Sequence, residues 1–224
     1  MIKTVARHQF KLILRSRWLA SFGLLFALLA IFISYFGQSG QSGEMEFTRM
    51  TASLLNLNLL LIPLIALLMG SLFLAGEKED RGLMLMLTYP VPGSAIITGK
   101  YIGLFLAVWT VITFGYGAAL AMMYIGAVTV SISAILTFYL LSILLAGIFL
   151  ALAMLIGLLS ATRFQALGIS LILWAWLVLF YEFMVMGASL LLSNQWVLPV
   201  LSVSILLNPV EIIRVWSILS LDGT

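Results

Sequence analysis

The chain reads YIGLFLAVWTVITFGYGAALAMMYIGAVTVSISAILTFYLLSILLAGIFLALAMLIGLLSAT from Tyr101 to Thr162, which is 62 consecutive residues without a charged side chain. An α-helix rises about 1.5 Å per residue, so roughly 20 residues cross the hydrocarbon core of a bilayer. The run is therefore long enough for two crossings and a turn, which we place near Gly126–Ser133. Its residues do not alternate with period two, which favours helices over the strands of a membrane barrel.

Further apolar runs lie on both sides of this stretch. Trp18–Gly43 and Met50–Gly76 contain no charge, and Ala166–Leu192 is interrupted only by Glu182. Of the 224 residues, 63% are apolar and 8% are charged, against about 25% charged in an ordinary soluble domain. We therefore predict an all-α membrane protein. Its five spans cover residues 18–36, 54–75, 101–125, 134–159 and 166–192, so the transmembrane part is 18–192.

Composition also excludes several classes of function. The chain has no cysteine, which excludes a disulfide-stapled module, and its net charge of +3 is small for a nucleic-acid-binding protein. The only histidine, His8, has no cysteine or second histidine to share a metal, so we predict no metal site. The 11 methionines could bind monovalent copper, but flexible core packing is the commoner use of this side chain.

Two glycine motifs resemble nucleotide-binding sequences but lack their requirements. Gly93–Lys100 has the wrong glycine spacing for a phosphate loop, and Tyr101 stands where a serine or threonine would bind the metal. Gly115–Gly117 lies inside a predicted span, so we interpret it, like Gly99 and Gly103, as a close helix contact. We therefore predict no catalytic residue and no cofactor bound by this chain.

The basic residues predict the orientation of the chain. Nine of the 11 lysines and arginines lie on one side of the predicted spans, and the positive-inside rule places that side, with the N-terminus, in the cytoplasm. Residues 1–17 predict an amphipathic helix in the cytoplasmic interface, because basic and apolar residues recur there at helical spacing. The alternative is a basic anchor without defined structure. The basic set is Lys3, Arg7, Lys11 and Arg15, and the apolar set is Ile2, Ala6, Phe10 and Ile13.

Residues 193–224 predict a re-entrant or interfacial region on the outer side. Trp196–Leu207 has only 12 apolar residues and contains Pro199, so it is too short to cross a bilayer but can dip into it and return. We expect a second short helix from Val210 to Leu219, with Asn208 as its N-cap and Pro209 as its first helical residue.

Glu182 is a carboxylate near the centre of the fifth predicted span. A charged side chain at such a position raises the free energy of membrane insertion by about 2.5 to 3.5 kcal/mol. The carboxyl group is therefore normally paired, protonated or turned to a polar cavity. We expect no basic residue at this depth. We interpret Glu182 as facing a subunit interface or a translocation path, hydrogen-bonded to Tyr181 or to nearby serine or asparagine groups. The alternative is a protonated carboxyl that only packs helices together.

The predicted cytoplasmic loop 76–100 joins five consecutive charged residues to a short apolar helix. The charges occupy Glu77–Arg81, the helix covers Leu83–Leu87, and Pro90 and Pro92 follow it. We expect no part of this chain to cover the apolar face of that helix, which favours a cytoplasmic partner protein. The alternative is a plain solvated loop that carries the positive-inside charges.

These features resemble the permease subunits of type-2 ABC exporters over essentially the whole chain. The resemblance rests on the basic start leading into Arg17–Trp18, on Pro63–Leu68, on the loop 76–100 with Leu87–Pro90, and on Leu207–Ile212. Within the family it is strongest for the branch linked to maturation of nitrous oxide reductase.

The resemblance implies a transmembrane domain that works as a homodimer in the inner membrane, with a separate cytoplasmic ATPase subunit that binds ATP and magnesium. Gly82–Tyr89 would be the coupling helix that docks on the ATPase, and Pro199–Val215 would close the exit. It also allows a periplasmic or extracytoplasmic partner. The implied coupling residues are Glu77, Glu79, Asp80, Arg81, Leu83, Leu85, Leu87 and Tyr89, and the implied outer gate residues are Asn208, Pro209 and Glu211.

The resemblance leaves three questions open. Family members have six spans with both ends in the cytoplasm, whereas this sequence reaches Thr224 where the sixth would begin. Either the sequence stops short of that span or our interpretation of 196–207 is wrong. The substrate is open between a sulfur species, copper-centre assembly, lipid, peptide and ion. A motor-free membrane scaffold or assembly factor is the alternative function, and an intramembrane enzyme is poorly supported because Glu182 has no second catalytic group beside it.

Overall fold

The computed structural model describes residues 2–37, 44–88, 91–125, 132–191 and 194–222, and every regular element among them is a helix. Four of these helices are long and apolar enough to cross a membrane, or up to six if each of two bent pairs counts as one span. The prediction of an all-α membrane protein is therefore confirmed. In chain order the elements are α1 (Ile2–Leu14), α2 (Arg17–Gly37), α3 (Glu44–Glu79), α4 (Gly82–Leu87), α5 (Gly93–Ile125), α6 (Ile132–Leu159), α7 (Arg163–Trp174), the π-helix η1 (Ala175–Phe180), α8 (Tyr181–Leu191), α9 (Asn194–Leu207) and α10 (Pro209–Asp222).

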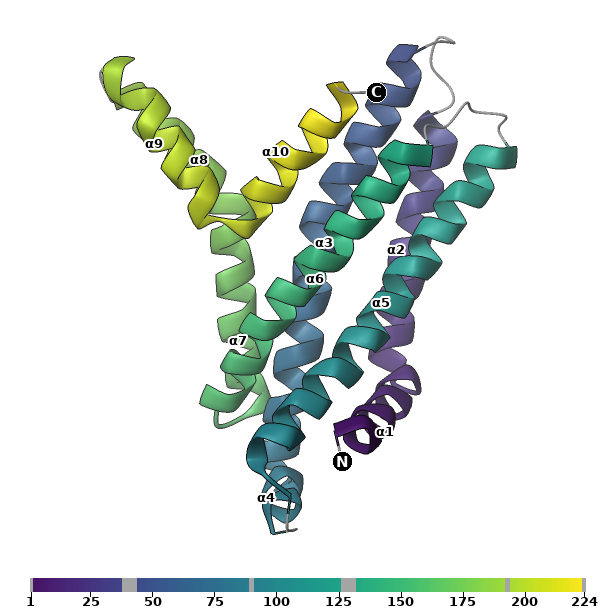
Figure 1. The fold of residues 1–224 in the computed structure, drawn as a ribbon, viewed down its shortest axis with the longest axis vertical. Coiled ribbons are helices and arrows are strands. Elements are labelled where there is room, and N and C mark those ends of the chain that lie inside the picture. The colour runs from purple at the N-terminus through teal and green to yellow at the C-terminus, as the bar shows by residue number, and fades with distance from the viewer. Residues whose placement is uncertain (1, 38–43, 89–90, 126–131, 192–193, 223–224) are drawn as a thin grey trace.

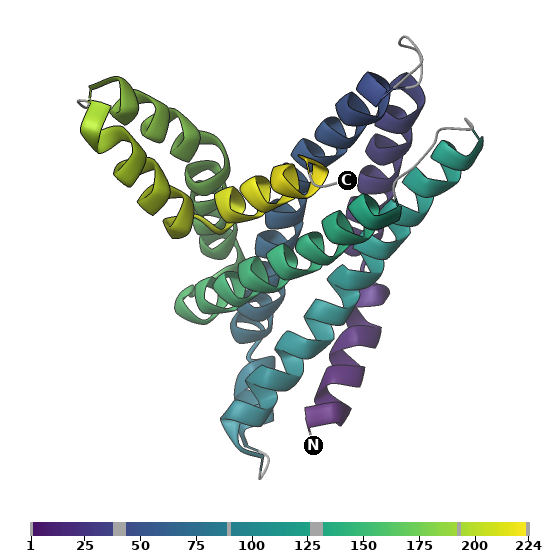
Figure 2. The ribbon, with the colours of Figure 1, turned by 45° about the horizontal axis from the view of Figure 1, so that its top comes forward.

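The long helices α2, α3, α5 and α6 run side by side as a bundle (Figure 1). Helices α1 and α4 lie at one end of it, which we call the α4 end, and the C-terminus lies toward the opposite end. The continuous segment α7–η1–α8 leaves the bundle as it rises from the α4 end. Figure 2 shows that α8 and α9 then form a hairpin that projects away from the bundle, and that α10 returns toward it.

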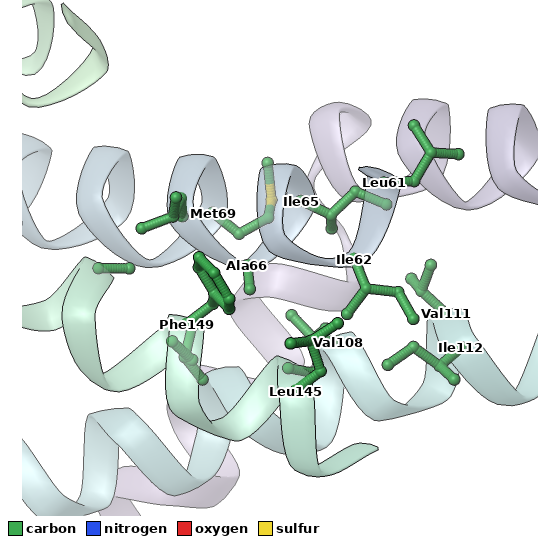
Figure 3. Close-up of a cluster of buried hydrophobic side chains, with 14 of the residues drawn as sticks. Leu61, Ile62, Ile65, Ala66, Met69, Val108, Val111, Ile112, Leu145 and Phe149 are labelled. Carbon is green, nitrogen blue, oxygen red and sulfur yellow. The ribbon is translucent and has the colours of Figure 1, made fainter. Parts of the chain in front are cut away.

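Helix α3 is the centre of the fold. About 72% of its most apolar stretch is buried inside the chain, against 11% for the α7–α8 segment. Its apolar side chains meet those of α5 and α6 in one cluster, in which Ile62 and Ala66 face Val108 and Phe149 (Figure 3). Small residues bring the backbones of α3 and α6 close together, because a Cβ atom added at Gly70 would lie 2.5 Å from the Cβ of Ala153.

The helix limits differ from the predicted ones around the loop 76–100. Helix α3 continues through Glu79, so three of the five charged residues are helical, and α5 begins at Gly93, well before Tyr101. The earlier start has a local cause, because the carbonyl of Pro92 accepts the backbone N–H of Ala95 at 2.9 Å and opens the first turn. The turn predicted near 126–133 falls mostly outside the described residues. The limits of the five spans stay a prediction.

The N-terminal segment forms the amphipathic helix α1, which bends by 67° into α2. Lys3, Arg7, Lys11 and Arg15 are exposed, while Ala6 and Ile13 are buried. The buried side packs on α5, where a Cβ atom at Gly103 would lie 2.6 Å from the carbonyl oxygen of Ala6.

The glycines predicted to make helix contacts divide into two groups. Gly99 packs against Val5 of α1 and Gly103 against Ala6, and Gly115 lies under the ring of Phe26 of α2. Gly117 makes no such contact, because a Cβ atom there would meet nothing within 4 Å. The interpretation of Gly115–Gly117 as a close contact is therefore right for Gly115 and wrong for Gly117.

We expect the Gly70→Ala substitution to destabilise the bundle. The added methyl group would overlap Ala153, and overpacking of this kind costs about 1–3 kcal/mol. Gly168→Ala is the matched control, because a Cβ atom there meets nothing within 4 Å and alanine is the better helix former. Thermal unfolding of the two purified variants in detergent tests this, and a Gly70→Ala protein as stable as Gly168→Ala would contradict the close α3–α6 contact.

Candidate functional site

Helix α4 presents two apolar side chains at the end of the molecule. Met84 is 70% exposed and Leu85 64% exposed, whereas Leu83 is partly buried and packs against the main apolar cluster. The expectation that no part of the chain covers this helix is therefore wrong for Leu83 and holds for Met84 and Leu85. The side chain of Leu87, and Tyr89 as a whole, lie outside the described residues.

Arg81 sets the direction of α4. Its φ of 61° places it in the left-handed region, and it is the one non-glycine residue of the described chain with a positive φ. Side chains there cost roughly 1–2 kcal/mol relative to the right-handed conformation. The sharp turn lets α3 end and α4 leave at an angle, and the Arg81 carbonyl accepts the backbone N–H of Leu85 at 3.1 Å.

The four charged residues just before Arg81 all bind other groups of the chain. Lys100 of α5 is only 1% exposed, and its ammonium group forms an ion pair with the Glu77 carboxylate. The same ammonium group lies 3.5 Å from the side-chain oxygen of Gln9, which is buried on α1. A buried cation needs such partners because its desolvation costs several kcal/mol. The three residues thus join α1, α3 and α5.

Lys78 caps the C-terminal end of α6. Its Nζ donates to the carbonyl oxygens of Leu158 at 2.8 Å and Ser160 at 2.9 Å. Carbonyls at the end of a helix have no partner within that helix, and a cation there also complements the helix dipole. Lys78 therefore fixes the end of α6 to α3.

Glu79 and Asp80 bind the start of α7. The Glu79 carboxylate accepts the backbone N–H of Arg163 at 2.9 Å and lies 3.8 Å from its Nε, and Asp80 forms an ion pair with the same guanidinium group. That group crosses Gly76 so closely that a Cβ atom there would lie 2.7 Å from Nε. Thr162 caps α7 by accepting the Gln165 N–H at 3.2 Å, which holds Arg163 in place.

We call Glu77, Lys78, Glu79, Asp80, Lys100 and Arg163 the basal charge cluster. It ties α3 to α5, α6 and α7 directly above α4. The sequence predicted Glu77, Glu79 and Asp80 as docking contacts, but in the structure all three pair within the chain. Sequence reasoning missed Lys78, Lys100 and Arg163 as members, although each is one of few charges at the edge of a long apolar run.

A second group of charges lies near the α9–α10 bend. Arg214 of α10 forms an ion pair with Glu182 of α8 and lies 3.3 Å from the Glu211 carboxylate, measured from Nη1 to Oε1. The expectation that no basic residue lies at the depth of Glu182 is therefore wrong. The cause is the 107° bend between α9 and α10, which brings Arg214 back beside α8. We call Glu182, Glu211 and Arg214 the α10 charge cluster.

The π-helix η1 and the Asn208–Pro209 corner meet beside this cluster. A π-helix bonds five residues ahead instead of four, which frees backbone carbonyls. The side-chain amide of Asn208 donates to the Leu177 carbonyl at 2.7 Å, and its oxygen accepts the Val210 N–H at 3.0 Å, as an N-cap does. Tyr181 donates its hydroxyl to the Ser204 carbonyl at 2.7 Å. These bonds hold the α9–α10 pair against the fifth apolar segment.

Among the described residues, no three histidine, cysteine, aspartate or glutamate side chains gather closely enough to hold a metal ion. Apart from Lys78, which binds two backbone carbonyls, both charge clusters consist of carboxylates paired with cations. Their arrangement is suited to holding helices in register rather than to acid–base chemistry.

Comparison with known proteins gives one consistent result. Residues 3–216 match the family described as ABC-2 family transporter protein. The chain is 36% identical over 230 residues to "Probable ABC transporter permease protein NosY" of Pseudomonas aeruginosa, an alignment that covers 100% of this chain and 83% of that protein. It is 34% identical over 226 residues to the protein of the same description from Stutzerimonas stutzeri, with 98% and 82% covered.

We expect the Glu77–Lys100 pair to dominate the stability of the basal charge cluster. Glu77→Ala leaves the buried Lys100 unpaired and should cost about 3–5 kcal/mol, whereas Arg163→Gln removes half-exposed pairs and should cost about 0–1 kcal/mol. The double variant Glu77→Leu with Lys100→Met should recover most of the loss. Thermal unfolding in detergent measures all three, and equal losses in Glu77→Ala and Arg163→Gln would argue against a buried pair.

Proposed function

The chain belongs to the ABC-2 family of transporter proteins, and from that premise we propose that it is the membrane permease of an exporter driven by a separate cytoplasmic ATPase. It is a NosY-like permease by its similarity to the two relatives. The observation that carries the proposal is the exposed apolar surface of Met84 and Leu85 on α4. Apolar side chains at the tip of a projecting helix are suited to a groove on a partner protein.

The basal charge cluster supports a mechanical role for α4. A force on α4 passes through Arg81 into the end of α3, and the ion pairs of Glu77, Glu79 and Asp80 carry it to α5 and α7, as Lys78 carries it to α6. In the proposed cycle, ATP binding draws two ATPase subunits together and they move the α4 helix of each permease. The long helices then tilt and open a path outward. The chain supplies no nucleotide-binding motif of its own, so ATP and magnesium belong to the ATPase.

We propose that the permease works as a homodimer in the inner membrane with its N-terminus in the cytoplasm. The α7–α8 segment is only 11% buried by its own chain, and the Glu182 side chain on it is 51% exposed. An exposed carboxylate in a membrane segment is unfavourable against lipid, so a second copy covering this face would remove the cost. Asn208, Pro209 and Glu211 lie beside that face and form the outer gate in this arrangement.

The similarity to the NosY permeases further leads us to propose a role in the maturation of nitrous oxide reductase. The exported species is open between a sulfur compound, a species used in copper-centre assembly, a lipid, a peptide and an ion. The chain has no cysteine, so it would not carry sulfur as a covalent adduct or copper on a thiolate.

Replacing Met84 and Leu85 together with aspartate should abolish association with the ATPase. Loss of two buried apolar side chains costs about 3 kcal/mol or more, which is a hundredfold or greater drop in affinity. His8→Asp is the control, because it adds negative charge to an exposed residue at the same end of the molecule without changing α4. Co-purification of the ATPase from membranes measures the effect.

Two outcomes would count against this part of the proposal. If the Met84→Asp, Leu85→Asp variant and the unmodified protein recovered equal amounts of the ATPase, α4 would not be the docking element. The unmodified protein purified from native membranes without any ATPase subunit would favour the motor-free scaffold or assembly factor instead.

Glu182→Leu should weaken the homodimer, whereas Glu182→Gln should weaken it less because the amide can still accept a hydrogen bond from Arg214. If Glu182 faced lipid, leucine would be the better residue and the change would be neutral or favourable. Met186→Leu, four residues along the same face of α8, is the control. Cross-linking yield and ATP-driven turnover of the complex measure the effect, and full dimerisation with full turnover in both Glu182 variants would exclude an interface role.

A further inference from the structure

A pair of adjoining apolar hollows opens on the surface of α5 near α1. The larger has a volume of about 690 Å³ and runs from Phe10 of α1 past Trp109 to Gly117. The smaller, of about 280 Å³, lies between α1, α2 and α5 and is lined by Leu14 and Gly23. Thr110 and Phe114 line both hollows, so the two meet along α5.

The polar groups on the wall of these hollows are already bonded within the chain. Thr110 donates its hydroxyl to the Ala107 carbonyl at 2.7 Å, and Thr113 donates to the Trp109 carbonyl at 2.9 Å. The indole N–H of Trp109 donates to the Tyr139 hydroxyl at 2.7 Å. The wall therefore offers an occupant a hydrocarbon surface, and an apolar occupant fits it best.

The length of the larger hollow matches one leaflet of a bilayer. Its lining extends along α5 from Leu106 to Ala118, which is roughly 18 Å of helix. Half of the hydrocarbon core is roughly 15 Å thick. Because the hollow begins at α1, which lies at the α4 end of the molecule, we assign it to the leaflet on that side.

Two cations of α1 share a stripe with residues that line the hollows. Lys3, Arg7, Phe10 and Leu14 follow one another at spacings of four, three and four, so they share one stripe of α1. Phe10 lines the larger hollow and Leu14 the smaller, and Lys3 and Arg7 are exposed on the same stripe toward the N-terminus of α1. The sequence of α1 contains no acidic residue. A positive entrance with two apolar channels is complementary to an anionic headgroup with two acyl chains.

We propose that these hollows form a binding site for one anionic phospholipid of the α4-side leaflet. The headgroup phosphate lies against Lys3 and Arg7, one acyl chain lies in the larger hollow and the other in the smaller. The bound lipid holds α1 against α5 and α2. None of the residues that line the hollows belongs to α4 or to either charge cluster, so the proposal does not depend on the proposed ATPase coupling.

The headgroup half of the proposal is tested by lipid competition. The full-length protein is purified in detergent with equal amounts of phosphatidylglycerol and phosphatidylcholine, and retained lipid is counted by native mass spectrometry. We expect a preference for phosphatidylglycerol on the order of tenfold. The Lys3→Gln, Arg7→Gln variant should reduce it to near equality. The Lys11→Gln, Arg15→Gln variant removes the same charge from the neighbouring stripe and should keep it.

The acyl-chain half is tested at Gly117. Because a Cβ atom there meets nothing within 4 Å, Gly117→Leu puts a side chain into the larger hollow without disturbing the bundle. We expect it to lower retention of either lipid several-fold. Gly117→Ala improves helix propensity in the same way but leaves most of the hollow open, so it should bind nearly as the unmodified protein does.

Several results would overturn the proposal. Equal retention of the two lipids by the unmodified protein would show that the site does not select an anionic headgroup. If both charge variants lost the preference for phosphatidylglycerol equally, that preference would reflect only a general attraction between a basic helix and an anionic membrane. Undiminished lipid retention by Gly117→Leu, or cross-linking that places a second copy of the chain on Trp109, would show that the hollows are not the site.

Discussion

The ion pair between Lys100 and Glu77 is the interaction on which the α4 end of the molecule depends. A fully buried ammonium group is stable only with a carboxylate beside it, so while residue 100 is lysine the packing of α5 on α3 and α1 at this level requires Glu77. The neighbouring charges bind α6 and α7 through more exposed contacts, Lys78 at two backbone carbonyls of the α6 end and Glu79 and Asp80 at Arg163. Helix α3, which is the most buried of the long helices, thus ends in a set of charges that determines where its neighbours end or begin.

In this arrangement the charged segment before α4 has a different structural role from the one that its sequence indicates. Five successive charges next to an apolar helix are typical of a solvated loop or a docking surface. In the structure Glu77, Lys78, Glu79 and Asp80 bind other groups of the chain, although only Glu77 is partly buried, and Arg81, Met84 and Leu85 are exposed. Docking through α4 would therefore use the apolar contact of Met84 and Leu85, while the paired charges attach the helix to the spans.

The sequence predicted the parts of the structure that depend on local composition. The charge-free runs predicted the long helices, and the Asn208–Pro209 pair predicted the start of α10. It could not predict pairings between distant residues, because Lys100 and Arg163 lie 23 and more than 80 positions from their partners on α3. Arg214 was missed for the same reason, since its position beside Glu182 follows from the bend between α9 and α10. Gly115 and Gly117 could not be distinguished from the sequence. They differ because Phe26 of α2 packs against Gly115, whereas a Cβ atom at Gly117 would meet nothing within 4 Å.

The π-helix η1 has a consequence for the spacing of residues in the fifth apolar segment. It contains one residue more than a plain α-helix would need to cover the same rise, and each residue turns a helix by about 100°. Removing a single residue between Ala175 and Phe180 would restore regular α-helical geometry and leave the helix beyond it on nearly the same side, because the extra residue is accommodated within the wider π-turn. The same deletion in a regular α-helical part of the segment would instead turn Glu182 by about 100° away from Arg214. In related chains, the loss of one residue at η1 would thus be compatible with the ion pair, whereas its loss elsewhere between Arg163 and Glu182 would break it.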